Sequence, residues 1–246
     1  MDSLAIISDI HGNIPALEAV LADIRSRKIS SIICLGDLAG KGPQPAEAVD
    51  LIRENCDVVI QGNWDDFLPN DTDQDTLKWH QDRLGNERLA YLKRLSFHHD
   101  FWISGKLVRL LHASAKSVHH RVLPHHSDEE RAAMFDQTEW TGEFSLGGKP
   151  HIVGYGDIHS AYLQHLDCGT LFNAGSIGNP LDFPESSYVL MKGNLGDREP
   201  APYSIEFIRV PYDIEDAVER ARMAGMPELE PYIKELRTAV YRGKQK

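Results

Sequence analysis

Aspartate, asparagine and histidine residues recur in this chain in short polar motifs, each placed directly after an apolar segment. Carboxylate and amide oxygens mixed with imidazole nitrogens suit Mn, Fe or Zn better than Ca or an all-oxygen Mg site. An Asp-x-His spacing at the end of a strand lets two side chains approach one ion as the backbone turns. The pattern therefore predicts a metal centre. The candidate residues are Asp9, His11, Asp37, Asn63, Asp65, His112, Asp157 and His159.

Each motif alone says little, because a single Asp-x-His or Gly-Asp is most often a turn, a helix cap or a surface feature. The motifs DIH, GD, GNWD and GDIH follow one another along this chain, and a lone histidine ends a further apolar run. The complete set, in this order and always after a strand, is difficult to obtain by accident. The combination carries the prediction.

The elements that must position these side chains are strands that alternate with helices. Apolar runs at 4–8, 31–35 and 57–60 predict buried strands, and each ends just before one of the motifs. Asn13 is a suitable N-cap for a helix after the first strand, with Pro15 in its first turn. A second helix follows the second strand. This order is typical of an open α/β sheet, whose sites lie at the carboxyl ends of the strands.

The remainder of the chain changes character twice. Residues 70–140 look helical and charged, with two apolar strands between, and the second half is rich in strand patterns. We expect one domain over residues 1–246, without a linker or an internal repeat, and with the helices at about 213–241 packed on it. Further strands are expected at 98–103, 107–114, 151–159, 161–166, 170–178, 187–192 and 203–210, and the last helices at 214–225 and about 229–241.

Composition and charge narrow the classes of function. The chain has 246 residues, of which 41% are hydrophobic and 26% charged, as is ordinary for a soluble globular protein. A net charge of −11 argues against stable binding to nucleic acids or membranes, because both need basic surface. It does not exclude small phosphate esters as substrates, because bound metal ions can neutralise the negative charge of the phosphate. No apolar stretch approaches the roughly 20 residues of a membrane-spanning helix.

The cysteines and the first residues indicate a cytoplasmic protein. Cys34, Cys56 and Cys168 are odd in number, widely spaced and outside any Cys-x-x-Cys pattern, so we expect free thiols in a reducing compartment. Cys34 lies within an apolar strand and is expected in the core. The N-terminal segment has an acidic residue at position 2 and only a short apolar run, which is typical of a core strand rather than of a signal peptide.

In their order the motifs resemble those of the calcineurin-like metallophosphoesterases, whose pattern runs D-x-H, G-D, G-N-H-[DE], H and G-H-x-H. The resemblance covers about residues 4–180. The stretch NAGSIGNP at 173–180 is also similar to the smaller prokaryotic members, which include phosphodiesterases and hydrolases of dinucleoside polyphosphates. The resemblance implies an α/β (α+β) fold, a four-layer αββα sandwich in which helices flank two mixed β-sheets.

The resemblance also implies a ligand set and a reaction. Two divalent or trivalent ions, Mn and/or Fe with Zn as an alternative, would generate a hydroxide near neutral pH and direct it at phosphorus. The implied reaction is hydrolysis of a phosphodiester or nucleotide phosphoanhydride bond in a small phosphoester or nucleotide substrate. Asp37 would bridge the ions, and Asp65 would hold a ligand in place through hydrogen bonds. One ion would bind Asp9, His11 and His159, and the other would bind Asn63, His112 and Asp157.

The sequence departs from the family pattern at two positions. Trp64 stands where the pattern has the histidine that often assists the leaving group, and indole cannot usefully donate a proton. The site should then favour a good leaving group, as in phosphoanhydrides and activated diesters, or leave protonation to water. Trp64 either packs beside the metal loop or stacks on a base of the substrate.

Asp157 is the second departure, because it replaces the first histidine of G-H-x-H. A carboxylate can still bind a metal and would favour harder ions such as Mn or Fe, and we expect it to do so. The alternative is a second ion that is weakly held or absent.

Residues in two places are further candidates for contact with the substrate. Lys41, in the glycine-rich loop after Asp37, either meets a phosphate oxygen or faces solvent. His119, His120 and Arg121 follow His112 closely, which makes them better candidates than the other paired histidines. The paired histidines elsewhere are expected at the surface, because neighbours on an extended strand face opposite ways and seldom bind one ion together.

Two other functions stay open. The first is phosphomonoesterase or protein phosphatase activity, which the absent G-N-H histidine disfavours. The second is a catalytically weak metal-binding scaffold, which Trp64 and Asp157 favour. The glycine-rich motifs of dinucleotide-binding proteins and NTPases and the nucleophile elbow of serine hydrolases do not occur in the sequence.

Overall fold

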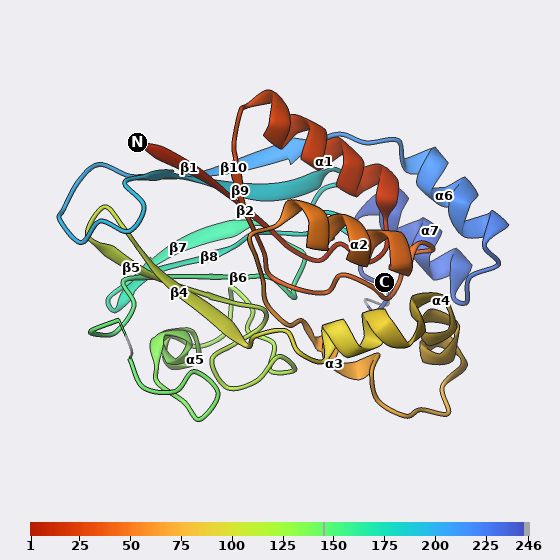
Figure 1. Cartoon of the computed structure of the whole chain (residues 1–246), viewed down its shortest axis with the longest axis horizontal. Coiled ribbons are helices and arrows are strands. Elements are labelled where there is room, and N and C mark those ends of the chain that lie inside the picture. Colours follow the sequence, from red (N-terminus) through yellow and green to blue (C-terminus); the bar gives the residue numbers. More distant parts are fainter. Residues whose placement is uncertain (145, 244–246) are drawn as a thin grey trace.

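Two five-stranded β-sheets form the centre of the protein (Figure 1). The computed structural model describes residues 1–144 and 146–243. The strand order is β10-β9-β1-β2-β3 in the first sheet and β4-β5-β6-β8-β7 in the second. Each sheet is mixed: β1 is parallel to β2 and antiparallel to β9, while β8 is parallel to β6 and antiparallel to β7. The strands are β1 (Asp2–Ile7), β2 (Ser31–Cys34), β3 (Val58–Val59), β4 (His98–Ile103), β5 (Lys106–Leu111), β6 (Ile152–Tyr155), β7 (Tyr162–Leu166), β8 (Gly169–Asn173), β9 (Ser186–Gly193) and β10 (Ser204–Val210).

Alternation along the strands places apolar side chains on both faces of the first sheet. In β1, Ala5 and Ile7 pack toward the helices, whereas Leu4 and Ile6 pack between the two sheets. A strand that is buried on both faces reads as an unbroken apolar run, which explains the pattern LAII. The core between the sheets is completed by Ile33, Leu35, Val108, Leu110, Ile152, Phe172, Val189 and Met191.

Helices cover the outer face of the first sheet (Figure 1). Asn13 caps the first of them by accepting a hydrogen bond from the Ala16 N–H at 3.2 Å, and Pro15 lies in its first turn. The longest helix is kinked at Gly85, where φ is +68°. The helices are α1 (Ile14–Ser26), α2 (Pro45–Asn55), α3 (Asn63–Phe67), α4 (Asp75–Leu92), α5 (Asp128–Ala132), α6 (Ile214–Met223) and α7 (Leu229–Thr238).

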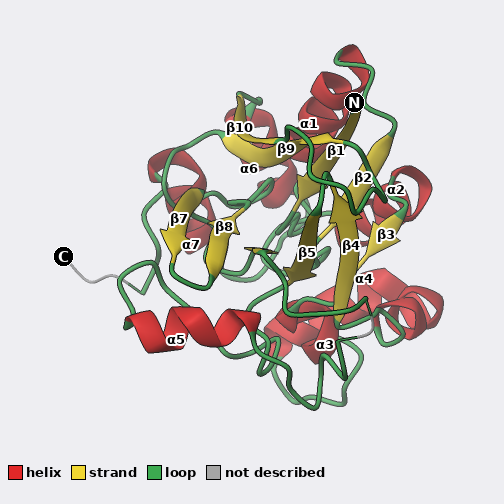
Figure 2. Cartoon of the chain, turned by 90° about the vertical axis from the view of Figure 1, so that its left-hand side faces the viewer, coloured by secondary structure: helices red, strands yellow, loops and turns green. Residues whose placement is uncertain are grey.

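The outer face of the second sheet is covered mainly by the long connection between β5 and β6, with α5 and a short 3-10 helix, Ala133–Phe135, inside it (Figure 2). Phe135, Tyr155 and Leu171 belong to the apolar cluster under this connection. The C-terminal helices α6 and α7 pack on each other, and α6 contacts α1. Among the helices of residues 1–144 and 146–243, none is both long and apolar enough to cross a membrane.

The predicted fold class is confirmed: two mixed five-stranded sheets are flanked by helices. Cys34 is fully buried, as expected. The third strand is shorter than predicted, and α3 was not predicted at all. The single domain over residues 1–246 stays a prediction, and Ser145 and residues 244–246 lie outside the described residues.

Candidate metal centre

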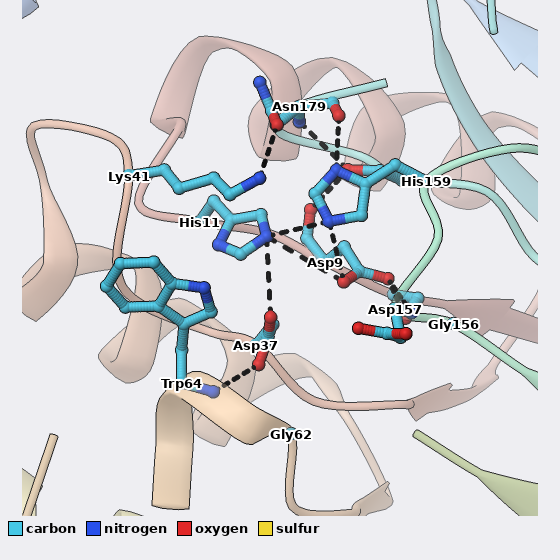
Figure 3. A network of polar contacts seen from close by, with 12 residues as sticks. Asp9, His11, Asp37, Lys41, Gly62, Trp64, Gly156, Asp157, His159 and Asn179 are labelled. Carbon is cyan, nitrogen blue, oxygen red and sulfur yellow. Dashed lines mark hydrogen bonds and ion pairs between the residues drawn. The ribbon is translucent and has the colours of Figure 1, made fainter. Parts of the chain in front are cut away.

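Four predicted ligands, Asp9, His11, Asp37 and His159, converge where the two sheets meet (Figure 3). Each offers one ligand atom, and these atoms all lie within 4.8 Å of one another. They follow β1, β2 and β6, and the loops after β1 and β2 are joined by backbone hydrogen bonds, among them one from the Asp9 N–H to the Gly36 carbonyl at 3.0 Å. The carboxyl ends of strands from both sheets therefore build one cluster.

The backbone turns sharply at these positions. Residues other than glycine rarely adopt positive φ, because the Cβ atom then crowds the backbone. Such conformations cost about 1–3 kcal/mol each and persist only where the surrounding structure enforces them. Left-handed backbone is found at Asp9 (φ 54°), His11 (φ 51°), Asp37 (φ 55°), Lys41 (φ 61°), Asp157 (φ 63°) and His159 (φ 57°).

The histidines of the centre share one arrangement. The Nδ1 atom of His11 lies 3.2 Å from the Ala39 carbonyl, and that of His112 lies 2.8 Å from the Leu35 carbonyl. His159 Nδ1 lies 2.5 Å from a third carbonyl, that of Asn179. A carbonyl only accepts, so each Nδ1 carries the hydrogen, and in the neutral ring Nε2 keeps its lone pair. Metal-binding histidines are oriented in this way.

Unpaired acceptor atoms face one another inside the cluster. Asp9 Oδ2 accepts hydrogen bonds from Ser8 Oγ at 2.6 Å and from the Asp157 N–H at 3.1 Å. Among the described residues, Asp9 Oδ1 is buried and has no hydrogen-bond partner. It lies 3.1 Å from His159 Nε2, which is itself 3.1 Å from His11 Nε2. Lone pairs that converge on one point without a donor fit a bound cation.

The electrostatics of the cluster agree with this fit. Burial raises the pKa of Asp37 well above its usual range, and the neighbouring Asp9 and Asp65 carboxylates add to the rise. Burial alone would lower the pKa of His112, but Asp37 and Asp9 raise it to about 9. Burial also lowers the pKa of His11, which keeps its imidazole neutral. The pocket concentrates negative charge, which bound cations would compensate.

Asn63 and His112 form a second group beside Asp37. His112 Nε2 lies 3.0 Å from Asn63 Oδ1 and 3.5 Å from Asp37 Oδ1. The other oxygen of Asp37, Oδ2, lies 3.6 Å from His11 Nε2. The Asp37 carboxylate therefore stands between the two groups, which is the geometry a bridging ligand requires.

Asp65 connects the loop after β2 to the start of α3. Its buried carboxylate accepts three backbone hydrogen bonds, from the N–H groups of Asp37 at 2.8 Å, Leu38 at 3.1 Å and Gly62 at 2.9 Å. A Cβ atom on Gly62 would lie 2.2 Å from Asp37 Oδ1, so only glycine lets the two loops approach so closely. Asp65 thus positions Asp37 rather than facing the cluster itself.

Asp157 is placed differently from the other predicted ligands. Its carboxylate is held by Arg121 in a two-pronged ion pair, with Nε 2.9 Å from Oδ2 and Nη2 2.8 Å from Oδ1. Its backbone N–H donates to Asp9 Oδ2 of the four-residue cluster at 3.1 Å. Ligation of a metal by Asp157 stays a prediction, and it would require exchange of this partner.

Three of the residues predicted to contact substrate lie around the cluster. Trp64 packs its ring on Gly40, where an added Cβ would come within 2.3 Å, and its ring centroid is 6.2 Å from those of His11 and His80. Lys41 donates from Nζ to Asn179 Oδ1 at 2.9 Å (Figure 3). His119 is bonded to Asp66 of α3 at 2.8 Å, on an exposed loop.

Sequence reasoning missed one residue and one ion pair of this region. It gave no role to Asn179, whose carbonyl orients His159 and whose side chain accepts from Lys41 at 2.9 Å. The NAGSIGNP stretch was the available signal for Asn179. Arg121 was a predicted candidate for a substrate-side role, but its ion pair with Asp157 was not predicted.

Known proteins resemble this chain along most of its length. The family model of the calcineurin-like phosphoesterase superfamily domain matches residues 3–194. An uncharacterized protein of Methanocaldococcus jannaschii is 32% identical over 244 residues, which cover 92% of this chain and 94% of that protein. A solved metallophosphoesterase of Sphaerobacter thermophilus is 26% identical with a TM-score of 0.75, covering 97% of this chain and 100% of its own. A hypothetical protein of Pyrococcus horikoshii, 22% identical over 100% of both chains, has the same fold with a TM-score of 0.76.

Proposed function

The chain belongs to the calcineurin-like phosphoesterase superfamily, and on this premise we propose that it hydrolyses a phosphodiester or nucleotide phosphoanhydride bond with bound metal ions. One observation carries the proposal: the buried Asp9 Oδ1 has no hydrogen-bond partner among the described residues and lies 3.1 Å from His159 Nε2. A side chain kept in this state is unfavourable for stability alone, because a buried acceptor without a partner costs about 1–3 kcal/mol.

We propose two metal positions that share Asp37. The ions proposed are Mn or Fe, with Zn as an alternative, since the donors are mixed imidazole, carboxylate and amide groups. When bound, such ions lower the pKa of water and neutralise charge on phosphate. The first position would use Asp9, His11, Asp37 and His159, and the second would use Asp37, Asn63 and His112, with Asp157 as its predicted further ligand.

In this reaction the side chains of the protein would place the substrate and the attacking water relative to each other. Water adds to phosphorus, the bond from phosphorus to the leaving oxygen breaks, and the proton released by water passes to that oxygen or, where the leaving group is a stable anion, to solvent. Trp64 cannot supply this proton, because indole is a very weak acid. We therefore propose substrates whose leaving group needs no protonation, which favours phosphoanhydrides and activated diesters over simple alkyl phosphomonoesters.

The proposed setting is the cytoplasm, with a small phosphoester or nucleotide as substrate. All three cysteines, Cys34, Cys56 and Cys168, are free thiols in the structure, which suits a reducing compartment. The net charge of −11 disfavours stable binding to nucleic acids.

The proposal is tested by metal analysis of protein purified without chelator, together with an assay of bis(4-nitrophenyl) phosphate in Mn-supplemented buffer. We expect at least one metal per chain and turnover that chelation abolishes. Chelation should also lower the free energy of unfolding, by roughly 3 kcal/mol where free metal had exceeded its dissociation constant about 100-fold. Hydrolysis of phosphomonoesters alone would support the phosphatase alternative. Less than one metal per chain without turnover of any phosphoester would support the scaffold alternative.

A further inference from the structure

A cavity of about 310 Å³ opens beside the metal cluster, next to His159. Two cationic side chains, Lys41 and Arg121, line it together with Asp157 and the apolar residues Leu123, Pro124 and Leu181. Tyr241 of the C-terminal segment also lines it. The cavity therefore combines hydrogen-bond donors of positive charge with an apolar wall, and it adjoins the place where a phosphate would react.

Lys41 is fixed in position from two directions. Its backbone has a φ of 61°, and its Nζ donates to Asn179 Oδ1 at 2.9 Å. The amide of Asn179 in turn donates to the buried Glu235 of α7 at 3.3 Å, while its carbonyl faces His159 Nδ1. An ammonium group has three N–H donors, and this contact uses one. Within the described residues no hydrogen bond engages the other two, which are available to a ligand in the cavity that Lys41 lines.

Arg121 is also held in position, by a two-pronged ion pair with Asp157. The ion pair engages Nε and Nη2, and it raises the pKa of the guanidinium further above its usual value, so its charge is permanent. The two N–H groups of Nη1 make no hydrogen bond within the described part of the chain. A guanidinium that is oriented by one carboxylate and still has free donors is prepared to bind a second oxyanion.

The C-terminal segment that supplies Tyr241 lies beyond residues 3–194, which the family model matches. It is anchored by Arg242, whose guanidinium and backbone N–H all reach Glu235, with Nη2 2.8 Å from Oε2 and Nε 2.9 Å from Oε1. Glu235 is fully buried. The anchored tail thus adds an aromatic ring to the lining of the cavity.

We propose that this cavity binds a second phosphate group of the substrate, held by Lys41 and Arg121, with the organic group of that phosphate against Leu123, Pro124 and Tyr241. The inference rests on the proposed function, because it takes the reacting phosphate to lie at the metal cluster. It selects one substrate class, organic phosphoanhydrides, in which two phosphates are directly joined. A second phosphate bound there also stabilises the leaving group, which compensates for the absence of an acid at Trp64.

The test is calorimetric titration of the full, metal-loaded chain with three probes that are not hydrolysed: methylphosphonate, methylenediphosphonate and phosphonoacetate, with free metal buffered equally throughout. We expect methylenediphosphonate to bind at least tenfold more tightly than either of the others. The advantage should fall below threefold in Lys41→Gln. Arg53→Gln, which removes a surface cation paired with Glu87, is the matched control and should retain the full advantage.

The Arg121→Gln variant also leaves Asp157 without its partner, so it is compared with the double variant Arg121→Gln/Asp157→Asn, which keeps the local charge balanced. Both should lose most of the advantage of methylenediphosphonate. An advantage that survives in Lys41→Gln and in the double variant would overturn the inference. So would equal binding of phosphonoacetate, which would assign the cavity to anions in general.

The same preparations are assayed with bis(4-nitrophenyl) phosphate, which has a single phosphate. Turnover of this ester without a binding advantage of methylenediphosphonate would reject the cavity assignment and keep the proposed function. A binding advantage of methylenediphosphonate without any turnover would reject the proposed function and keep the assignment of the cavity as a site for two joined phosphates.

Discussion

The two halves of the metal centre differ in how their polar atoms are satisfied. Around Asp9, His11 and His159, acceptors face one another at distances near 3.1 Å, and Asp9 Oδ1 has no partner in the described chain. Around Asn63 and His112, the two side chains approach each other at 3.0 Å, and the nearby Asp157 is fully paired with Arg121. The first half is arranged for a cation, whereas the second satisfies much of its own charge.

This difference indicates unequal affinity for metal. A ligand atom without a partner in the protein gains on binding an ion and loses nothing, whereas a carboxylate already bonded to a guanidinium must first give up that pair. The first position should therefore fill at lower metal concentration than the second. Asp37 is the residue that belongs to both halves, with one oxygen 3.6 Å from His11 Nε2 and the other 3.5 Å from His112 Nε2.

The largest effect is expected from Asp37→Asn, because it removes the carboxylate common to both halves. We expect kcat/KM for an aryl phosphodiester to fall by roughly 10³-fold or more, since the electrostatic stabilisation of the transition state is lost. The metal-free variant should be at least as stable as the metal-free parent. The raised pKa of Asp37 means that the folded state disfavours its ionised form, so a neutral amide removes an unfavourable charge.

Activity and thermal unfolding with and without chelator measure both parts of this prediction. Asp136→Asn is the control, because Asp136 pairs with Lys149 on the surface and should be neutral for activity. Activity within tenfold of the parent would show that Asp37 does not join the two halves.

An intermediate effect is expected from Asp157→Asn. If the carboxylate mainly orients Arg121, the variant should keep its metal content and lose about tenfold in kcat/KM, in the range found when residues that support a metal site are replaced. Metal analysis at a series of free Mn concentrations makes the measurement, with Asp182→Asn as the control because Asp182 forms a comparable two-pronged pair with Arg209. Loss of one metal per chain would instead show that Asp157 is a metal ligand. The two halves would then both use a carboxylate of their own to bind an ion.

The two halves also differ in how far the sequence predicted them. Asp9, His11 and Asp37 follow neighbouring strands of one sheet, and the rule that strand ends meet at one edge predicted that they lie together. His159 follows β6 of the second sheet, and only the family resemblance grouped it with them. The pair between Asp157 and Arg121 joins residues 36 positions apart, and Arg121 lies in a connection without periodic pattern. The direction of a side chain in such a loop is decided by tertiary packing.

The helix α3 was missed for a related reason. It has only 5 residues, too few for helical periodicity to show, and it is held by Asp65 rather than by its own propensity. The left-handed backbone at Asp9 and His159 was equally invisible, because neither residue type requires it. The sheets, by contrast, follow from apolar runs that are buried on both faces, and these were predicted to within a few residues.

The smallest effect on turnover is expected from His80→Leu, which changes the support of the second half. His80 is buried in α4 against Trp64, the residue after Asn63, with 6.2 Å between ring centroids. Burial lowers the pKa of His80 to about 4 from the ordinary 6.5. In the unfolded chain the His80 imidazole therefore becomes protonated below about pH 6.5, whereas in the folded protein it becomes protonated only below about pH 4. Protonation of His80 alone should lower the free energy of unfolding by about 3 kcal/mol over that pH window.

The variant His80→Leu should remove this part of the decline, which urea titrations at pH 7 and pH 4.5 measure. It should change kcat/KM less than about threefold at pH 7. His165→Leu, at an exposed histidine, should leave the decline as it is. An unchanged decline in His80→Leu would show that acid acts elsewhere, and a large loss of activity at pH 7 would show that the second half depends on the packing of Trp64 as strongly as the first depends on its ligands.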